Sequence, residues 1–218
     1  MSNVKHFQEN TTGIDYVVGD IHGCFEVLEE TLCHLNFNPT VDRLFSVGDL
    51  VDRGPASEDS LDWLAKPWFH AVRGNHEQMA IDLQTYGEDM YARHNGMGWI
   101  LDMPKSHQKL YAECFKDLPL AIDITVGDKK YGIVHADVPV GDWDDIEAAL
   151  DGHNADGYAN LAMWGRDRIN YKDKSIIKNV EVVYVGHTPL KEVTPLGNVL
   201  FIDTGACFKG ALTVMRMY

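Results

Sequence analysis

The chain has 218 residues, of which 45% are hydrophobic and 24% are charged, an ordinary balance for a globular protein that argues against wholesale disorder. Its formal net charge of −14 makes the average surface repel duplex nucleic acid and anionic lipid, so neither is expected as a partner. No apolar run approaches the ~18 residues that a membrane-spanning helix needs, and residues 1–12 lack the apolar segment of a signal peptide. The four cysteines form no C-x-x-C pair and are interpreted as reduced thiols, which predicts a cytoplasmic protein.

Short apolar runs alternate with amphipathic segments along the whole chain, without a repeat or a linker, so one domain covering residues 1–218 is expected. The predicted strands are 15–18, 44–47, 69–72, 120–126, 131–135, 182–185, 199–203 and 212–215. The predicted helices are 25–35, 57–64, 76–86, 106–117 and 143–150.

The first half of the chain repeats one pattern three times: a strand ends, a glycine or turn follows, and a helix begins. This pattern is typical of parallel strands with helices on the faces of the sheet. Ser57 is expected to cap the second helix. Gly127-Asp128, between two later strands, predicts a hairpin. The whole indicates an α/β sandwich of mixed β-sheets flanked by helices.

Charged turns follow each of the three early strands. They are Gly19-Asp20-Ile21-His22-Gly23, then residues 48–54 with the sequence GDLVDRG, then Gly74-Asn75-His76-Glu77. Ligands of parallel α/β sheets bind just outside the carboxyl ends of the strands. Three such turns on neighbouring strands are therefore expected to converge on one site.

Six of the polar residues at strand ends carry oxygen or nitrogen ligands for metal ions. They are Asp20, His22, Asp49, Asn75, His135 and His187. A single aspartate after a strand is more often a helix N-cap than a ligand, but six such residues, mostly beside glycines, favour a metal centre. Without a thiolate, this set suits two divalent cations such as Mn²⁺, Fe or Zn²⁺ better than Cu(I) or an iron–sulfur cluster.

The motifs GDxHG, GDxxDRG and GNHE, in this order and spacing, resemble the signature of the PPP-type metallophosphoesterases. The chain is most similar to the short bacterial and bacteriophage (lambda-like) serine/threonine protein phosphatases, from about Val17 to Gly210. The later elements His135-Ala136-Asp137 and Gly186-His187-Thr188-Pro189 match the same family. This resemblance implies a calcineurin-like metallophosphoesterase sandwich.

The resemblance also implies roles for individual residues. Asp20, His22 and Asp49 would hold a first metal ion, and Asp49, Asn75, His135 and His187 would hold a second.

Three arginines match the family's phosphate-binding positions: Arg53, Arg73 and Arg166. The match at Arg166 is looser, because Gly165 stands where a polar residue is expected, and Arg168 is the alternative.

His76 matches the catalytic acid and Asp52 its carboxylate partner. Two cations would generate a bridging hydroxide for direct in-line attack on phosphorus, and His76 would protonate the leaving group. The metals and arginines would make the site positive inside an acidic chain.

Three functions compete at this point. The first is a phosphatase of phosphoserine and phosphothreonine in proteins or peptides, which would also accept phosphotyrosine or phosphohistidine. The second is a symmetrical dinucleoside tetraphosphate hydrolase, and the third is a metal-binding scaffold without catalysis. Asp52 and Glu77 favour the first, because the nucleotide hydrolases carry a small residue and an Asp at these two positions. No regulatory subunit is implied, and a monomer is expected.

The sequence leaves two interpretations open for the aromatic residue Trp99. Trp99, in Asn95-Gly96-Met97-Gly98-Trp99, either lines the substrate groove or belongs to an ordinary buried turn.

Overall fold

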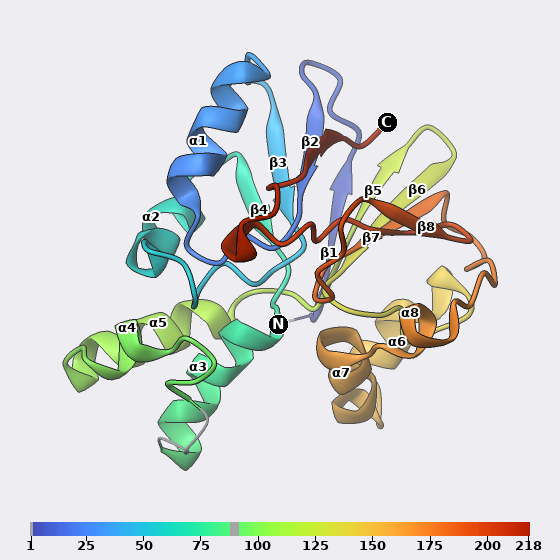
Figure 1. The fold of residues 1–218 in the computed structure, drawn as a ribbon. Coiled ribbons are helices and arrows are strands. Elements are labelled where there is room, and N and C mark those ends of the chain that lie inside the picture. Colours follow the sequence, from blue (N-terminus) through green and yellow to red (C-terminus); the bar gives the residue numbers. More distant parts are fainter. Residues whose placement is uncertain (1, 88–91) are drawn as a thin grey trace.

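Two mixed β-sheets packed face to face form the centre of the protein, in a computed structural model that describes residues 2–87 and 92–218 (Figure 1). The six-stranded sheet has the order β1 (Val4–Gln8), β5 (Ala121–Val126), β6 (Lys129–Val134), β7 (Val182–Val185), β9 (Val199–Phe201) and β8 (Thr194–Leu196). The four-stranded sheet has the order β10 (Val214–Arg216), β2 (Asp15–Val18), β3 (Arg43–Ser46) and β4 (Phe69–Ala71).

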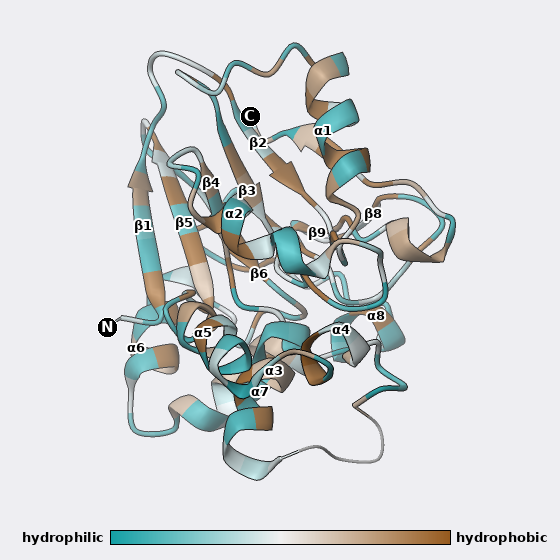
Figure 2. Cartoon of the chain, turned by 90° about the vertical axis from the view of Figure 1, so that its left-hand side faces the viewer, coloured by the Kyte–Doolittle hydropathy of each residue, from teal (hydrophilic) through white to brown (hydrophobic). Residues whose placement is uncertain are grey.

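Helices flank this pair of sheets on both sides (Figure 1). They are α1 (Phe25–His34), α2 (Ser60–Leu64), α3 (Asn75–Tyr86), α4 (Gly98–Leu101), α5 (Lys105–Lys116), α6 (Ile146–Asp151), α7 (Ala155–Trp164) and α8 (Asp167–Tyr171). Side chains of α1, α2 and α5 share a core with the four-stranded sheet, and those of α6 and α7 share one with the six-stranded sheet. Figure 2 shows α1 alternating between hydrophobic and hydrophilic turns, as expected for a helix that buries only Phe25, Leu28 and Leu32.

Alternation along the strands divides the apolar side chains between the cores. Val17 in β2 packs between the two sheets, together with Phe45, whereas its neighbours Tyr16 and Val18 face the helices. This is the period of two that places successive side chains on opposite faces. Both faces of the strand are therefore buried, which explains the apolar run from Tyr16 to Val18.

The predicted sandwich is confirmed. Strands β2, β3 and β4 are adjacent and parallel, β10 joins the edge of β2 antiparallel, and β5 and β6 form the hairpin predicted at Gly127-Asp128. None of the helices in residues 2–87 and 92–218 is long and apolar enough to cross a bilayer.

Five of the α-helices and strands in the described residues were not predicted: β1, β8, α4, α7 and α8. Strand β1 and helix α7 show why. Strand β1 pairs parallel with β5 but buries only Val4 fully, so its sequence has no clear apolar alternation. Helix α7 buries only Ala162 and Met163, which are too few to form a recognisable stripe. Tertiary pairing, not local pattern, defines both elements.

The predicted capping role of Ser57 is wrong. Ser57 lies inside a short 3₁₀ turn, Ser57–Asp59, and its side chain makes no helix-capping hydrogen bond. Its Oγ instead accepts a hydrogen bond from the backbone N–H of Asp52 at 2.8 Å. A hydroxyl can satisfy any nearby backbone donor, and here the donor belongs to the turn that carries a candidate catalytic residue.

Candidate metal centre and catalytic site

The candidate site lies where the carboxyl ends of strands from both sheets meet. Asp20, Asp49 and Asn75 follow β2, β3 and β4 of one sheet, while His135 and His187 follow β6 and β7 of the other. The convergence predicted for the three early turns is confirmed, because the turns lie on adjacent parallel strands.

Five non-glycine residues of these turns have left-handed backbone conformations. They are His22, Asp49, Asp52, Arg53 and His187, with φ values of 46°, 52°, 71°, 68° and 67°. L-amino acids adopt this region rarely and at a cost of about 1–3 kcal/mol each. Strain concentrated at one site is typical of functional residues held by their surroundings.

Glycines beside the candidate ligands allow two carboxylates to approach the backbone closely. A side chain at Gly186 would overlap Oδ1 of Asp20, and one at Gly74 would overlap Oδ1 of Asp49. The glycines that flank the motifs are therefore required by this packing.

One group of candidate ligands surrounds Asn75. Its Oδ1 lies 2.9 Å from Nε2 of His135 and 2.8 Å from Nδ1 of His187. Oδ1 of Asp49 lies 3.3 Å from the same Nε2.

The tautomer of His135 follows from its other ring nitrogen, which donates to the carbonyl of Val47 at 2.7 Å. A neutral His135 therefore presents a lone pair on Nε2 to the oxygens of Asn75 and Asp49. Lone pairs that converge at about 3 Å match adjacent ligands of one metal ion, for bond lengths of roughly 2.0–2.2 Å. The donor set fits a cation held between Asp49, Asn75, His135 and His187.

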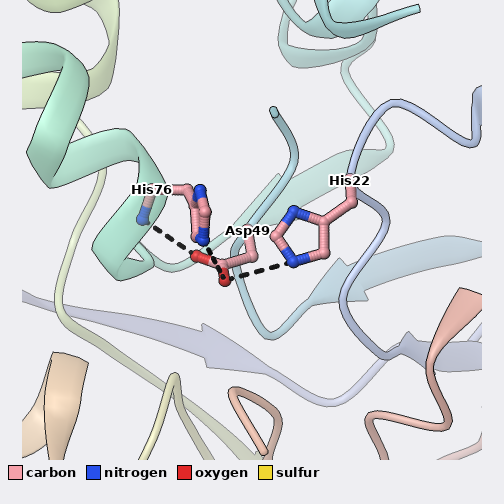
Figure 3. A group of neighbouring side chains, drawn as sticks. All are labelled: His22, Asp49 and His76. Atoms are coloured by element: carbon pink, nitrogen blue, oxygen red, sulfur yellow. Dashed lines mark hydrogen bonds and ion pairs between the residues drawn. The ribbon is translucent and has the colours of Figure 1, made fainter. Parts of the chain in front are cut away.

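A second group comprises His22, Asp49 and His76 (Figure 3). Oδ2 of Asp49 lies 3.5 Å from Nε2 of His22 and 3.8 Å from Nε2 of His76. Nδ1 of His22 donates to the carbonyl of Val51 at 2.7 Å, so its Nε2 carries the lone pair. A guanidinium nitrogen of Arg53 lies 2.6 Å from this Nε2 and places a positive charge where a metal ion would bind. Because Asp49 belongs to both groups, the arrangement fits two cations that share one carboxylate.

Asp20 is placed differently from the other candidate ligands. Both of its carboxylate oxygens accept the backbone N–H of His187, at 3.1 and 3.0 Å, and it is not part of either three-residue group. Burial, followed by the charges of Asp203 and Asp49, raises the pKa of Asp20 well above its usual value. These carboxylates form a buried acidic cluster that a cation would stabilise.

The three candidate imidazole ligands and Asp49 have the protonation states that metal binding requires. Burial lowers the pKa of His22 and of His187 to about 3, and it also lowers that of His135, so all three imidazoles are neutral at pH 7. Burial tends to raise the pKa of Asp49, but the imidazoles of His135, His76 and His22 lower it by more than burial raises it. The net pKa is below the usual value, and the group stays ionised.

His76 and Asp52 form a buried pair. Nδ1 of His76 lies 2.6 Å from Oδ2 of Asp52, and each residue is only 1% exposed. Burial tends to lower the pKa of His76, but the charge of Asp49 and the hydrogen bond to Asp52 raise it above the usual value. The protonated form is therefore favoured, and the carboxylate fixes the proton on Nδ1.

A cavity of about 260 Å³ opens onto this centre. The residues that line it are Asp49, Arg53, Asn75, His76, Met79, Asn95, Trp164, Arg166 and His187. It brings together candidate metal ligands, two of the three arginines and His76.

Three residues of the cavity wall were not identified as site residues from the sequence. Met79 has no charged or metal-ligating group that would mark it as a site residue in the sequence. Asn95 begins the segment Asn95-Gly96-Met97-Gly98-Trp99, for which a place in the substrate groove was one interpretation, and Trp164 stands two residues before Arg166.

Arg73 is not brought to the cavity. Its Nη2 donates to the backbone carbonyls of Lys116 and Leu118, at 2.8 and 3.1 Å, and its Nη1 donates to Gln78. These contacts connect the start of α3 to the segment after α5. The structure therefore gives no support to phosphate binding by Arg73.

Arg166, not the alternative Arg168, lines the cavity. Arg168 is buried and donates to the carbonyls of Asp173 and Ser175, at 3.1 and 2.9 Å. Packing explains why a glycine precedes Arg166. A Cβ at position 165 would lie 2.5 Å from the carbonyl oxygen of Leu161 and 2.8 Å from Cβ of Asp137, which is too close for either contact.

Comparison with known proteins agrees with this geometry. The family model described as calcineurin-like phosphoesterase matches residues 16–199. Over 206 residues, the chain is 37% identical to serine/threonine-protein phosphatase 1 of Salmonella typhimurium, covering 93% of this chain and 91% of that protein. It is 33% identical to serine/threonine-protein phosphatase 2 of Escherichia coli over 212 residues, covering 93% and 92%.

Two further comparisons are more distant. A symmetrical bis(5'-nucleosyl)-tetraphosphatase of Aromatoleum aromaticum is 29% identical over 202 residues, covering 87% of this chain and 71% of that protein. The structure of a protein serine/threonine phosphatase from Saccharomyces cerevisiae has the same fold, with a TM-score of 0.62 at 17% identity, covering 99% of this chain and 84% of that one.

Proposed function

Because the chain belongs to the calcineurin-like phosphoesterase family, we propose that it hydrolyses phosphoserine and phosphothreonine in proteins and peptides. The observation that carries this proposal is the shared cavity. Arg53, Arg166 and His76 line the same 260 Å³ space as the candidate metal ligands Asp49, Asn75 and His187.

The metal ions of the proposal are two divalent cations, with Mn²⁺ as the first choice and Fe or Zn²⁺ as alternatives. Asp49, Asn75, His135 and His187 would hold one, and His22 and Asp49, with Asp20 beside them, would hold the other. When bound, the ions supply a water of lowered pKa as nucleophile and polarise the phosphoryl oxygens. The neutral imidazoles and the ionised Asp49 are ready for this without further proton loss.

Arg53 and Arg166 would bind the phosphoryl group in this proposal. A guanidinium donates two parallel hydrogen bonds to phosphate oxygens and stabilises the charge that spreads over them during the reaction. Arg53 is exposed at the rim and contacts the ring of Phe208 at 5.3 Å, which helps to orient it. The cavity thus selects a phosphate dianion although the chain as a whole is acidic.

His76 would donate the proton that the leaving group needs. A serine or threonine alkoxide is a poor leaving group, so protonation of its oxygen matters for the rate. Nδ1 of His76 is committed to Asp52, which leaves Nε2 to carry the donated proton. This pair is the main reason to prefer alkyl phosphomonoesters as substrates.

The likeness to the tetraphosphatase of Aromatoleum aromaticum favours a second candidate, hydrolysis of dinucleoside tetraphosphates. A nucleoside diphosphate leaves as a stable anion and gains little from a proton donor. The buried Asp52–His76 pair is therefore better explained by the first candidate.

A substrate panel tests the proposal. The purified protein with Mn²⁺ is offered phosphoserine, phosphothreonine and phosphotyrosine peptides, p-nitrophenyl phosphate and diadenosine tetraphosphate, and kcat/KM is measured for each. We expect the phosphoserine and phosphothreonine peptides to be hydrolysed with higher kcat/KM than the dinucleotide. A preference for diadenosine tetraphosphate would establish the second candidate instead, and inertness toward the whole panel would contradict both.

A further inference from the structure

The carboxylate of Asp52 is held from two sides. One oxygen, Oδ2, lies 2.6 Å from Nδ1 of His76. The other, Oδ1, accepts a hydrogen bond from the indole Nε1 of Trp99, also at 2.6 Å. An indole N–H can only donate, so it always complements the charged carboxylate. The three side chains form a continuous line from Trp99 through Asp52 to the candidate proton donor.

Trp99 is itself fixed by a contact with another helix. Its ring packs edge-to-face on Tyr111 of α5, with centroids 5.0 Å apart, and the Tyr111 hydroxyl donates to the carbonyl of Glu58 at 2.7 Å. The backbone of Asp52 is fixed separately by the hydroxyl of Ser57. Main chain and side chain of Asp52 are thus restrained by different elements.

We infer that Trp99 is a positioning residue for proton donation by His76. The inference deepens the proposed function and rests on it. Without the indole N–H, Oδ1 of Asp52 loses this restraint and the carboxylate can turn about its Cβ–Cγ bond. Nδ1 of His76 then no longer has an acceptor in a fixed direction, and the imidazole loses the orientation that points Nε2 toward the leaving oxygen. Trp99 does not line the cavity, so substrate binding is not affected directly.

This role makes the effect of Trp99 depend on the leaving group. An alkoxide from phosphoserine needs the proton, whereas p-nitrophenolate leaves readily without one. For Trp99→Phe, which keeps an aromatic ring beside Tyr111, we expect kcat on a phosphoserine peptide to fall about tenfold or more. We expect kcat on p-nitrophenyl phosphate to stay within about twofold, and KM for both substrates to stay near wild type.

A double-mutant cycle tests whether Trp99 acts through Asp52. In an Asp52→Ala background, Trp99→Phe should cause no further loss on the phosphoserine peptide, because the acceptor of its N–H is already gone. Losses that multiply in the double variant, or equal losses on both substrates, would overturn the inference.

Two controls separate positioning from packing. Trp68→Phe makes the same change in the same apolar cluster and should leave the ratio of the two activities unchanged. If Trp99→Phe does not fold, site-specific replacement of Trp99 by 3-benzothienylalanine removes only the N–H and should give the same substrate-dependent loss. A wild-type protein inert toward both substrates would refute the proposed function, and the inference with it; an active wild type with an unaffected Trp99→Phe variant would refute the inference alone.

Discussion

Glu77 fixes the backbone that carries Asp49. Its Oε2 accepts hydrogen bonds from the N–H groups of Asp49 and Gly74, at 2.9 and 2.8 Å, and its Oε1 accepts from Leu50 at 2.8 Å. Glu77 is fully buried. The last residue of the GNHE motif therefore ties the turn after β4 to the turn after β3 and sets the position of the shared candidate ligand.

Replacing this carboxylate should weaken both the fold and the metal site. Glu77→Gln puts an amide group against backbone donors, so we expect a loss of about 2–3 kcal/mol in the free energy of unfolding and weaker Mn²⁺ binding. Urea unfolding and calorimetric titration measure the two effects. The exposed Glu30 provides the matched control Glu30→Gln, which should change neither. An unchanged unfolding free energy for Glu77→Gln would contradict the structural role.

The shared position of Asp49 predicts unequal effects of two ligand substitutions. Asp49→Asn should weaken both ions, whereas His187→Ala should weaken only the one bound near Asn75. Metal content after dialysis against Mn²⁺ should be two ions in the wild type, one in His187→Ala and fewer than one in Asp49→Asn. A chelator should abolish hydrolysis and lower the melting temperature, since ions that bind only the folded state stabilise it. The exposed His153 gives the control His153→Ala, and two tightly bound ions in Asp49→Asn would rule out the sharing.

Substitution of Arg166 should lower activity, whereas substitution of Arg168 should lower stability. Arg166→Ala removes a guanidinium from the cavity wall, so kcat/KM is expected to fall about 100-fold while stability stays within about 0.5 kcal/mol. Arg168→Ala leaves buried carbonyls without donors, so stability is expected to fall by about 2–4 kcal/mol. Steady-state kinetics and urea unfolding of both variants give the comparison. If the activity loss were confined to Arg168→Ala, the assignment of Arg166 would be incorrect.

A polar side chain at position 165, which the family pattern would place there, should destabilise this protein. Gly165→Asn brings a Cβ within 2.8 Å of Cβ of Asp137, so we expect a loss of about 1–3 kcal/mol in stability and a higher KM through displacement of Arg166. Gly141 has nothing within 4 Å of its would-be Cβ, and Gly141→Asn is the matched control. Thermal unfolding and KM for a phosphopeptide are measured for both variants. Equal values for Gly165→Asn and Gly141→Asn would contradict the prediction.

His70 should make stability depend on pH in a defined window. Burial, together with the charges of Lys5 and Arg43, lowers the pKa of His70 from 6.5 to about 4. Between these values the unfolded chain binds a proton that the folded protein does not, so stability falls as the pH is lowered from 6.5 to 4. His70→Phe keeps a ring beside Phe7 and Phe45 and removes this contribution. Urea unfolding at pH 7, 5.5 and 4.5 should therefore show a shallower decline in the variant, and parallel curves would contradict the expectation.

Most of the metal-ligand cluster could be predicted because its residues follow strand ends. A strand that ends in Gly-Asp or Gly-Asn places the next side chain at the edge of the sheet, and parallel neighbours bring such edges together without further information. Parallel pairing within a sheet brings Asp49 near Asn75, and His135 near His187. That the two pairs meet depends on how the two sheets pack against each other, which strand spacing alone does not indicate.

Side chains that act at a distance from the strand ends were less predictable. Arg73 follows β4 in sequence, yet its long side chain donates to carbonyls at the end of α5 and just after it. Trp99 reaches Asp52 across 47 positions of the chain. The directions of these two side chains depend on how the helices pack over the sheet, which no local sequence pattern predicts. Strand β1 and helix α7 were not predicted because each buries too few side chains to give a clear apolar pattern.

The division of ligands between the two sheets has a consequence for the order in which activity can arise. A growing polypeptide that has reached residue 130 already contains Asp20, His22, Asp49 and Asn75, but the two histidines of the candidate metal site around Asn75 are still to be synthesised. Until His187 has left the ribosome and the two sheets have packed together, this candidate site has only two of its four proposed ligands. On the proposed mechanism, hydrolysis would therefore begin only after both sheets have formed, and it would stop if they lost contact.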